Sequence, residues 1–156
     1  MQILSLSVFL FIFTTNALLR SFTFDFSTLD WDEVTYIMMG EGIRQGMIPF
    51  VDLWDIKPIG LYLIYTVANS LLGYNLETVR VLTLFFISLS AFGFFCILKK
   101  YNFWLAIFIS NFFQLGFIFL PSGLAGNTEV FFIFFQIWGV YFFLENPCYF
   151  NLLGHF

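Results

Sequence analysis

Residues 81–98, VLTLFFISLSAFGFFCIL, contain no charged side chain and are followed directly by Lys99 and Lys100. A helix needs about 20 mainly apolar residues to cross the hydrocarbon core of a bilayer, which is about 30 Å thick. Basic residues at the end of such a helix favour its cytoplasmic side. The stretch therefore predicts a membrane-spanning helix whose carboxyl end faces the cytoplasm.

Similar uncharged stretches lie on both sides of it. They are residues 1–19, 58–76, 101–128 and 130–144. Hydrophobic residues make up 60% of the chain and charged residues 10%. A soluble domain carries about 25% charged residues, so this chain has too few to cover a surface in water. We expect an all-α, polytopic membrane protein with about four transmembrane helices.

The expected division of the chain follows from these stretches. Residues 1–19 form the first transmembrane helix, because they lack the basic start of a cleaved signal peptide. Residues 20–80 form an extracytoplasmic loop with one or two juxtamembrane helices, and residues 81–156 hold further spans, at about 102–120 and 128–144. Counting back from Lys99 and Lys100, the amino terminus is cytoplasmic and the first loop faces outward from the cell (inner) membrane.

Residues 58–76 are long enough to cross, but a crossing would force Lys99 and Lys100 outside. A helix lying in or dipping into the outer interface, anchored by Tyr62 and Tyr65, fits better. Eight of the ten acidic residues lie between Arg20 and Glu77, which marks this part as a polar excursion between spans. The six basic residues form no cluster that would bind nucleic acid.

The loop has predicted internal structure. Asp30 and Glu33 have the spacing of a capping box, which predicts a helix over residues 31–45 that stops at Gly46. Residues 50–57 are expected to be extended, and Pro58 suits the first turn of the next helix.

Two clusters of this loop could carry chemistry. The sequence Asp30-Trp31-Asp32-Glu33 brings three carboxylates together, for which a cation, a general-base role or simple helix capping could account. In residues 52–57, two acids and Trp54 precede Lys57 at the start of the next helix and beside the membrane. Lys57 could bind a phosphate there, although Trp54 and Lys57 could equally serve as interfacial anchors.

Three further charged positions have alternative explanations. Arg80 lies at the outer mouth of the second span, where it could bind an anion or simply snorkel to the interface. Arg44 is expected to pair with Glu41 on the helix surface. Glu129 opens the last span on the outer side and could be functional or only solvated.

In this order and placement the motifs resemble those of the GT-C membrane glycosyltransferases, and more narrowly the bacterial ArnT-like and RgtA/B/C/D-like branch, related to protein O-mannosyltransferases. In that family the loop reads Asp-Glu, a helix, Pro-Tyr/Phe-x-Asp and then Asp-His-Lys-Pro-Pro. The chain offers Asp32-Glu33, residues 52–58 with Gly60 and Tyr62, and then Arg80. Asn127-Thr128-Glu129 resembles a family Asn-x-Glu segment that opens a later span.

The resemblance implies transfer of a sugar from a polyprenyl-phosphate donor to a lipid, glycan or protein acceptor on the outer face. Asp32 would take the proton of the acceptor hydroxyl. Glu33 would orient Asp32 or help it hold a divalent cation. Lys57 and Arg80 would stabilise the departing phosphate.

The chain has further acids that could contribute and two departures from the family pattern. The additional acids that could contribute are Asp30, Asp55 and Glu129. Ile56 and Ile59 stand where the family has His and its second Pro, and Ile56 removes a usual metal ligand. Because such enzymes normally carry around a dozen spans, we expect the chain to correspond to the amino-terminal part of one. The alternative is a non-catalytic membrane protein, such as a partner subunit or a remnant, in which the acids are only a solvated loop.

Overall fold

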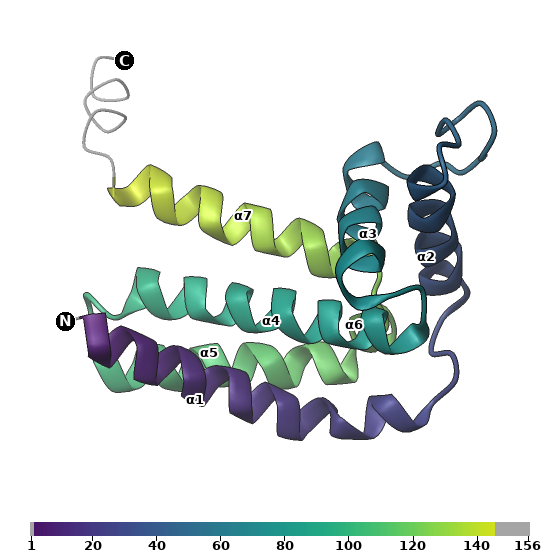
Figure 1. Cartoon of the computed structure of the whole chain (residues 1–156). Helices are drawn as coiled ribbons and strands as arrows, with labels where there is room; N and C mark the ends of the chain where they lie inside the picture. Colours follow the sequence, from purple (N-terminus) through teal and green to yellow (C-terminus); the bar gives the residue numbers. More distant parts are fainter. Residues whose placement is uncertain (1, 146–156) are drawn as a thin grey trace, which may run out of the picture.

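The computed structural model describes residues 2–145, which fold almost entirely into helices (Figure 1). They are α1 (Gln2–Arg20), the 3-10 helix η1 (Ser21–Asp25), α2 (Trp31–Arg44), α3 (Ile59–Leu72), α4 (Leu76–Leu98), α5 (Phe103–Phe119), α6 (Pro121–Leu124) and α7 (Thr128–Glu145). No strand forms within this range, which confirms the all-α prediction for these residues.

Three helical stretches are long and apolar enough to span a membrane. The first is Leu4–Asp25, which comprises most of α1 together with η1. The other two are α4 and α7. The chain is therefore compatible with an integral membrane protein, as predicted. The apolar helix α5 is shorter, with 17 residues, so the predicted total of about four spans depends on it. Helix α3 has 14 residues, which at about 1.5 Å per residue is too short to cross the hydrocarbon core.

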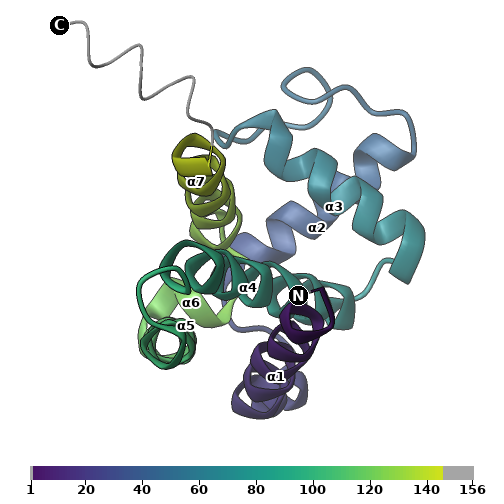
Figure 2. The same ribbon diagram turned by 90° about the vertical axis from the view of Figure 1, so that its left-hand side faces the viewer.

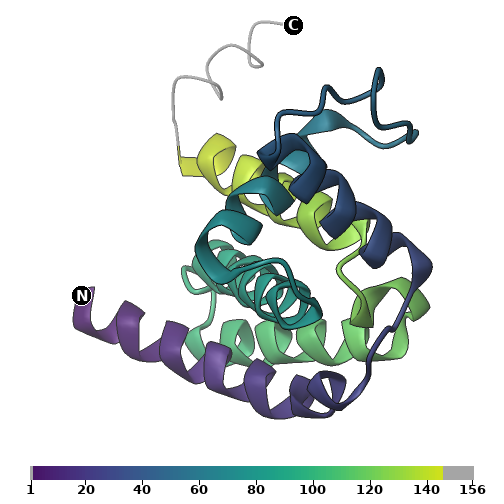
Figure 3. The ribbon, with the colours of Figure 1, turned by 45° about the vertical axis from the view of Figure 1, so that its right-hand side comes forward.

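Helices α1, α4, α5 and α7 lie side by side, and α4 contacts each of the other three (Figure 1). Seen along these helices, α2 and α3 pack against each other across one end of the group, with α3 nearer to it and α2 outermost (Figure 2). The chain after α1 crosses the end of the bundle to reach the start of α2 (Figure 3). Two short helices therefore form a layer over the ends of the long ones.

Hydrogen bonds from buried polar side chains fix α1 to its neighbours. The amide nitrogen of Asn16 donates to the carbonyl of Leu84 (3.1 Å) and to the hydroxyl of Ser88 (2.9 Å). Gln114 of α5 donates to the carbonyl of Ile12 (3.1 Å). In lipid, apolar surface gives helices little reason to associate, so such hydrogen bonds and close packing hold them together.

The second predicted span begins earlier than expected. Helix α4 starts at Leu76 because Asn75 accepts a hydrogen bond from the backbone N–H of Thr78 and caps the helix. The preceding Gly73 adopts φ 95°, which ends α3 and turns the chain. The charged Glu77 and Arg80 thus lie inside the first two turns of α4, where hydropathy alone assigned them to the loop.

Helices α2 and α3 approach closely at Gly40. A Cβ added there would lie 2.7 Å from Cβ of Tyr65 and 2.8 Å from the backbone nitrogen of Thr66. Gly40, which has no side chain, lets the two backbones touch and fixes α2 on α3.

The helix predicted over residues 31–45 is confirmed within one residue, and Gly46 ends it with φ 92°.

The α2–α3 loop (residues 46–57) corrects the prediction of an extended stretch over residues 50–57. Residues 48–52 form a turn in which Phe50 adopts φ 65° and its N–H donates to the carbonyl of Leu53 (2.7 Å). The carboxylate of Asp52 accepts from the N–H of Ile48 (2.8 Å) and closes the turn. Pro58 is the N-cap of α3, one residue before the predicted position.

Candidate functional site

The first turn of α2 carries the Asp30–Glu33 cluster and is built by a cap. Asp30 accepts a hydrogen bond from the N–H of Asp32 (3.3 Å), as expected of an N-cap. The carboxylate of Glu33 accepts from the N–H of Leu29 (2.7 Å), one residue before the cap. Helix capping thus accounts for Asp30. The side chains of Asp32 and Glu33 point away from α2 in different directions.

Glu33 turns inward and forms a buried ion pair with Arg80 of α4. Their side chains are 0% and 2% exposed, and Nη2 of Arg80 lies 2.9 Å from Oε1 of Glu33 while Nη1 contacts Oε2. Nε of Arg80 donates to the carbonyl of Thr23 (3.1 Å), after α1. Arg80 is thus enclosed by protein and does not snorkel at the outer mouth, and neither group reaches the surface to bind a cation or a phosphate.

Asp32 remains accessible. Its side chain is 48% exposed, it accepts a hydrogen bond from the hydroxyl of Tyr36 (2.8 Å), and it lies 3.7 Å from Nζ of Lys57, which is 31% exposed. The hydroxyl of Thr128, the first residue of α7, donates weakly to that of Tyr36 (3.4 Å). Three elements therefore meet around one half-exposed carboxylate.

A second tyrosine–aspartate pair lies beside the first. The hydroxyl of Tyr62 donates to Asp55 (2.8 Å) and accepts from the backbone N–H of Lys57 (3.1 Å). The rings of Tyr36 and Tyr62 are 6.4 Å apart between centroids. Burial, and then the bonded carboxylate of Asp55, raise the pKa of Tyr62, and burial also raises that of Tyr36. Both phenols therefore stay protonated at neutral pH and act as donors.

The turn before α7 closes the site from the other side. Asn127 donates to the free oxygen of Asp30 (2.9 Å), and Tyr65 donates to the carbonyl of Gly126 (2.5 Å). Glu129 lies in the first turn of α7 with its side chain exposed. Of the additional candidates, Asp30 and Asp55 therefore belong to this network, and no hydrogen bond or ion pair joins Glu129 to it.

The predicted Glu41–Arg44 pair is confirmed. Two nitrogens of Arg44 lie 2.8 and 2.6 Å from the carboxylate of Glu41, which also accepts from Gln45 (2.9 Å). The bonds from Arg44 lower the pKa of Glu41 to about 2. The carboxylate of Glu41 is therefore already paired, and it lies apart from the Asp32 site.

The sequence did not indicate the role of Arg20, or that the hydroxyls of Tyr36 and Tyr62 donate to Asp32 and Asp55. Arg20 is buried at the end of α1 and donates to the carbonyls of Gly123 (2.8 Å) and Leu124 (2.7 Å), which hold the turn leading to Asn127. No local pattern connects α1 with this turn. Tyr36, however, lies four residues after Asp32, a spacing that places two side chains on one helix face and could have been noticed.

The resemblance allows, but does not require, a divalent cation at Asp32 and Glu33. Among residues 2–145 no three His, Cys, Asp or Glu side chains come close enough to hold a metal. Asp32 and Glu33, the predicted candidates, point to different partners, because Glu33 is taken by Arg80 and Asp32 by Tyr36 and Lys57.

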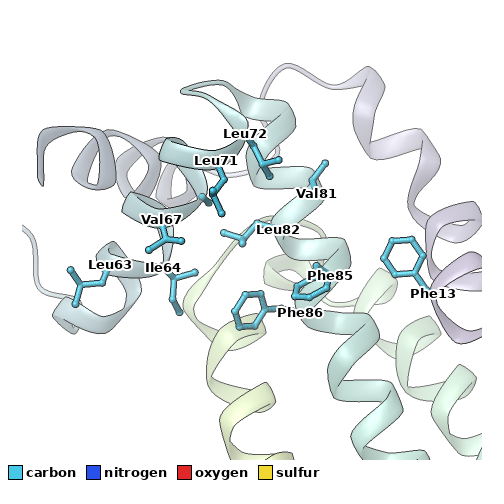
Figure 4. A pocket seen from close by; sticks show the side chains of 11 residues that line it. Phe13, Leu63, Ile64, Val67, Leu71, Leu72, Val81, Leu82, Phe85 and Phe86 are labelled. Atoms are coloured by element: carbon cyan, nitrogen blue, oxygen red, sulfur yellow. The ribbon is translucent and has the colours of Figure 1, made fainter. Parts of the chain in front are cut away.

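Two apolar grooves flank α3. A groove of about 240 Å³ between α3 and α7 begins beside the site, since Pro58 and Thr128 line it together with Leu61 and Phe131. A larger groove of about 590 Å³ lies between α3 and α4, with Phe13 of α1 at its edge (Figure 4). The smaller groove is the one next to the Asp32 site, because Thr128 in its lining contacts Tyr36 and Pro58 follows Lys57.

No family model, curated protein or solved structure matches the chain.

Proposed function

We propose that the chain is the amino-terminal part of a GT-C-type membrane glycosyltransferase, which transfers a sugar from a polyprenyl-phosphate donor to a lipid, glycan or protein acceptor on the outer face of the cell membrane. The observation that carries this proposal is the half-exposed Asp32, 3.7 Å from Lys57, near an apolar groove that Pro58 and Thr128 help to line. A carboxylate and a cation beside an open apolar groove suit a substrate with a charged head and an apolar tail.

The proposed reaction needs a base for the acceptor hydroxyl and a cation for the phosphate leaving group. Asp32 accepts the proton of the acceptor hydroxyl as its oxygen attacks C1 of the sugar with inversion. The bond between C1 and the phosphate oxygen breaks, and polyprenyl phosphate leaves with the electron pair. Lys57 stabilises the charge of this leaving group, while Tyr36 holds the carboxylate in place.

In this proposal, Glu33 and Arg80 have a different role from the one that the family resemblance implies. Their buried pair ties the first turn of α2 to α4 and, through Thr23, to the end of α1. In this proposal they orient the helix that carries Asp32 and do not touch the phosphate. Lys57 is then the main protein cation at the donor.

The orientation belongs to the same proposal. Lys99 and Lys100 end α4 at the side of the bundle opposite to α2 and α3 (Figure 1). With these lysines in the cytoplasm, the Asp32 site faces outward. A donor carried by a lipid can reach it there with its isoprenoid tail along the groove between α3 and α7.

The test is binding of a photoreactive polyprenyl-phosphate sugar to the full chain in nanodiscs. Lys57→Met removes a charge-assisted bond of about 1.5–3 kcal/mol, which corresponds to a loss of roughly 10- to 100-fold in affinity. Lys100→Met, at the other end of α4, should bind like the wild type. Equal binding by both variants, or no binding by the wild type, rejects the assignment.

The role of Asp32 is tested separately by sugar transfer in membranes that contain the full-length enzyme of which this chain is proposed to be the amino-terminal part. Asp32→Asn should abolish transfer and leave donor binding and membrane insertion intact, while Asp25→Asn, an exposed acid just after α1, should transfer normally. Substantial transfer by Asp32→Asn removes this residue from the base role.

One observation favours the alternative of a non-catalytic membrane protein. Most acids of the outer layer already serve the fold: Asp30 caps α2, Glu33 pairs with Arg80, Glu41 with Arg44, and Asp55 accepts from Tyr62. Under that alternative, neither the Lys57 nor the Asp32 substitution changes a measured binding or activity.

A further inference from the structure

The α2–α3 loop presents apolar side chains outward. Val51 is 75% exposed, Trp54 82% and Ile56 85%, and Ile48 is also exposed. Loops in water usually expose polar residues, and a contiguous exposed apolar patch marks a surface that contacts a partner or a membrane.

Several polar groups of this loop form hydrogen bonds within the protein. The N–H groups of Ile48, Phe50 and Asp52 all bond within the turn, at 2.8, 2.7 and 2.9 Å from their acceptors. The carboxylate of Asp55 is held by Tyr62 and by the N–H of Ile56. Since unpaired backbone groups are costly where water is scarce, this arrangement suits a loop that enters the boundary of a lipid layer.

The patch continues along α3. Its buried face packs on the protein through Tyr62, Tyr65 and Ala68, yet its opposite, exposed stripe is also apolar. The residues of this α3 stripe, four apart in sequence, are Ile59, Leu63, Val67 and Leu71. A helix that is apolar on both faces is not suited to water.

The α3 stripe joins a surface that already belongs to a membrane span. Leu63, Val67 and Leu71 form one wall of the larger groove, and Val81 and Phe85 of α4 form the other (Figure 4). Because α4 is long and apolar enough to cross the bilayer, lipid that covers its exposed residues extends without a break onto α3.

We propose that the α3 stripe and the α2–α3 loop insert into the adjoining leaflet of the phospholipid bilayer. The stripe contacts acyl chains, Trp54 lies at the level of the headgroups, and Lys57 reaches the phosphates. Helix α2, the outermost layer, faces water with Trp31 and Arg44. This inference does not depend on glycosyl transfer.

The test uses the full chain in nanodiscs made from phosphatidylcholine brominated along the acyl chain. The four tryptophans are residues 31, 54, 104 and 138, and all but one are replaced by Phe in each variant. Trp54 should lose several-fold more emission to the brominated lipid than Trp31, and aqueous iodide should quench Trp31 more strongly than Trp54. Equal iodide quenching of the two, or protection of Trp54 from both quenchers, overturns the proposal.

A second pair of variants tests the apolar contact itself. In the variant that keeps only Trp54, replacing Val51 and Ile56 by Asp should reduce quenching by brominated lipid. The matched control carries Trp31→Asp in place of Trp31→Phe, at an exposed position at the start of α2, and should leave quenching unchanged. Circular dichroism checks the helix content, and Val51→Ser with Ile56→Ser is the milder pair if the aspartates unfold the protein. Unchanged quenching in a folded variant also overturns the proposal.

Discussion

At the scale of single residues, a buried ion pair determines which of two adjacent acids is available. Asp32 and Glu33 follow one another in the chain, but α2 directs Glu33 to Arg80 inside the protein and Asp32 to Lys57 near its surface. Neighbouring carboxylates thus acquire different partners. The cause is the geometry of a helix, in which successive side chains point about 100° apart.

The buried pair makes a stability prediction. Glu33→Gln leaves the guanidinium of Arg80 buried without its counter-charge, and breaking such a pair costs about 3–5 kcal/mol. Unfolding by denaturant in mild detergent, followed by circular dichroism, should show a much lower midpoint than the wild type. Glu77→Gln, which changes an exposed acid in the first turn of α4, should unfold like the wild type. Equal midpoints for the two variants contradict this role of Glu33.

The sequence indicated only part of this site. The N-cap at Asp30 and the pair of Glu41 with Arg44 are local, so spacing alone was enough to predict them. The partners Glu33 and Arg80 are 47 residues apart, and Arg20 contacts a turn more than 100 residues away. Which residues meet at such separations depends on how the helices pack, and a single sequence does not contain that information in a readable pattern.

At the scale of elements, the close contact between α2 and α3 makes Gly40 sensitive. Gly40→Ala adds a Cβ 2.7–2.8 Å from three atoms of α3, two of them backbone, so the helices must move apart. Such overpacking costs about 1–3 kcal/mol. The same denaturant experiment should show a lower midpoint, and the shift of α2 should also weaken donor binding at Lys57.

The control is another glycine in the same layer. A Cβ at Gly60, in the first turn of α3, meets nothing within 4 Å. Gly60→Ala should therefore be neutral or stabilise by about 0.4–1 kcal/mol, because it restricts the unfolded chain. If Gly40→Ala is as well tolerated as Gly60→Ala, α2 and α3 do not pack as closely as described.

Hydropathy and capping residues predicted the positions of the helices better than they predicted the conformations of the loops. The apolar stretches became α1, α4, α5 and α7, because a long uncharged run has few alternatives in lipid. The start of α4 moved because Asn75 caps it before the charges end. The turn at residues 48–52 was missed because it depends on Phe50 adopting φ 65°, which is uncommon for a residue with a side chain.

At the scale of the whole molecule, the charges lie at opposite ends of the bundle. The acids, Lys57 and the layer of α2 and α3 are at one end, while Lys99, Lys100 and the partner of Lys100, Glu145, are at the other (Figure 1). The ion pair between Lys100 and Glu145, 3.9 Å apart, brings the carboxyl ends of α4 and α7 to the same side. The molecule is thus polar at both ends and apolar along its sides, which matches a bilayer.

This arrangement makes a prediction about topology. Cysteines introduced at Trp31, the exposed first residue of α2, and at Tyr101, just after the two lysines, should lie on opposite sides of the membrane. In intact cells a membrane-impermeant maleimide should label Trp31→Cys, and Tyr101→Cys should react only after the membrane is opened. Labelling of Tyr101→Cys in intact cells, with Trp31→Cys protected, means that Lys99 and Lys100 face outward. The Asp32 site would then face the cytoplasm, where a donor on the outer leaflet does not reach it.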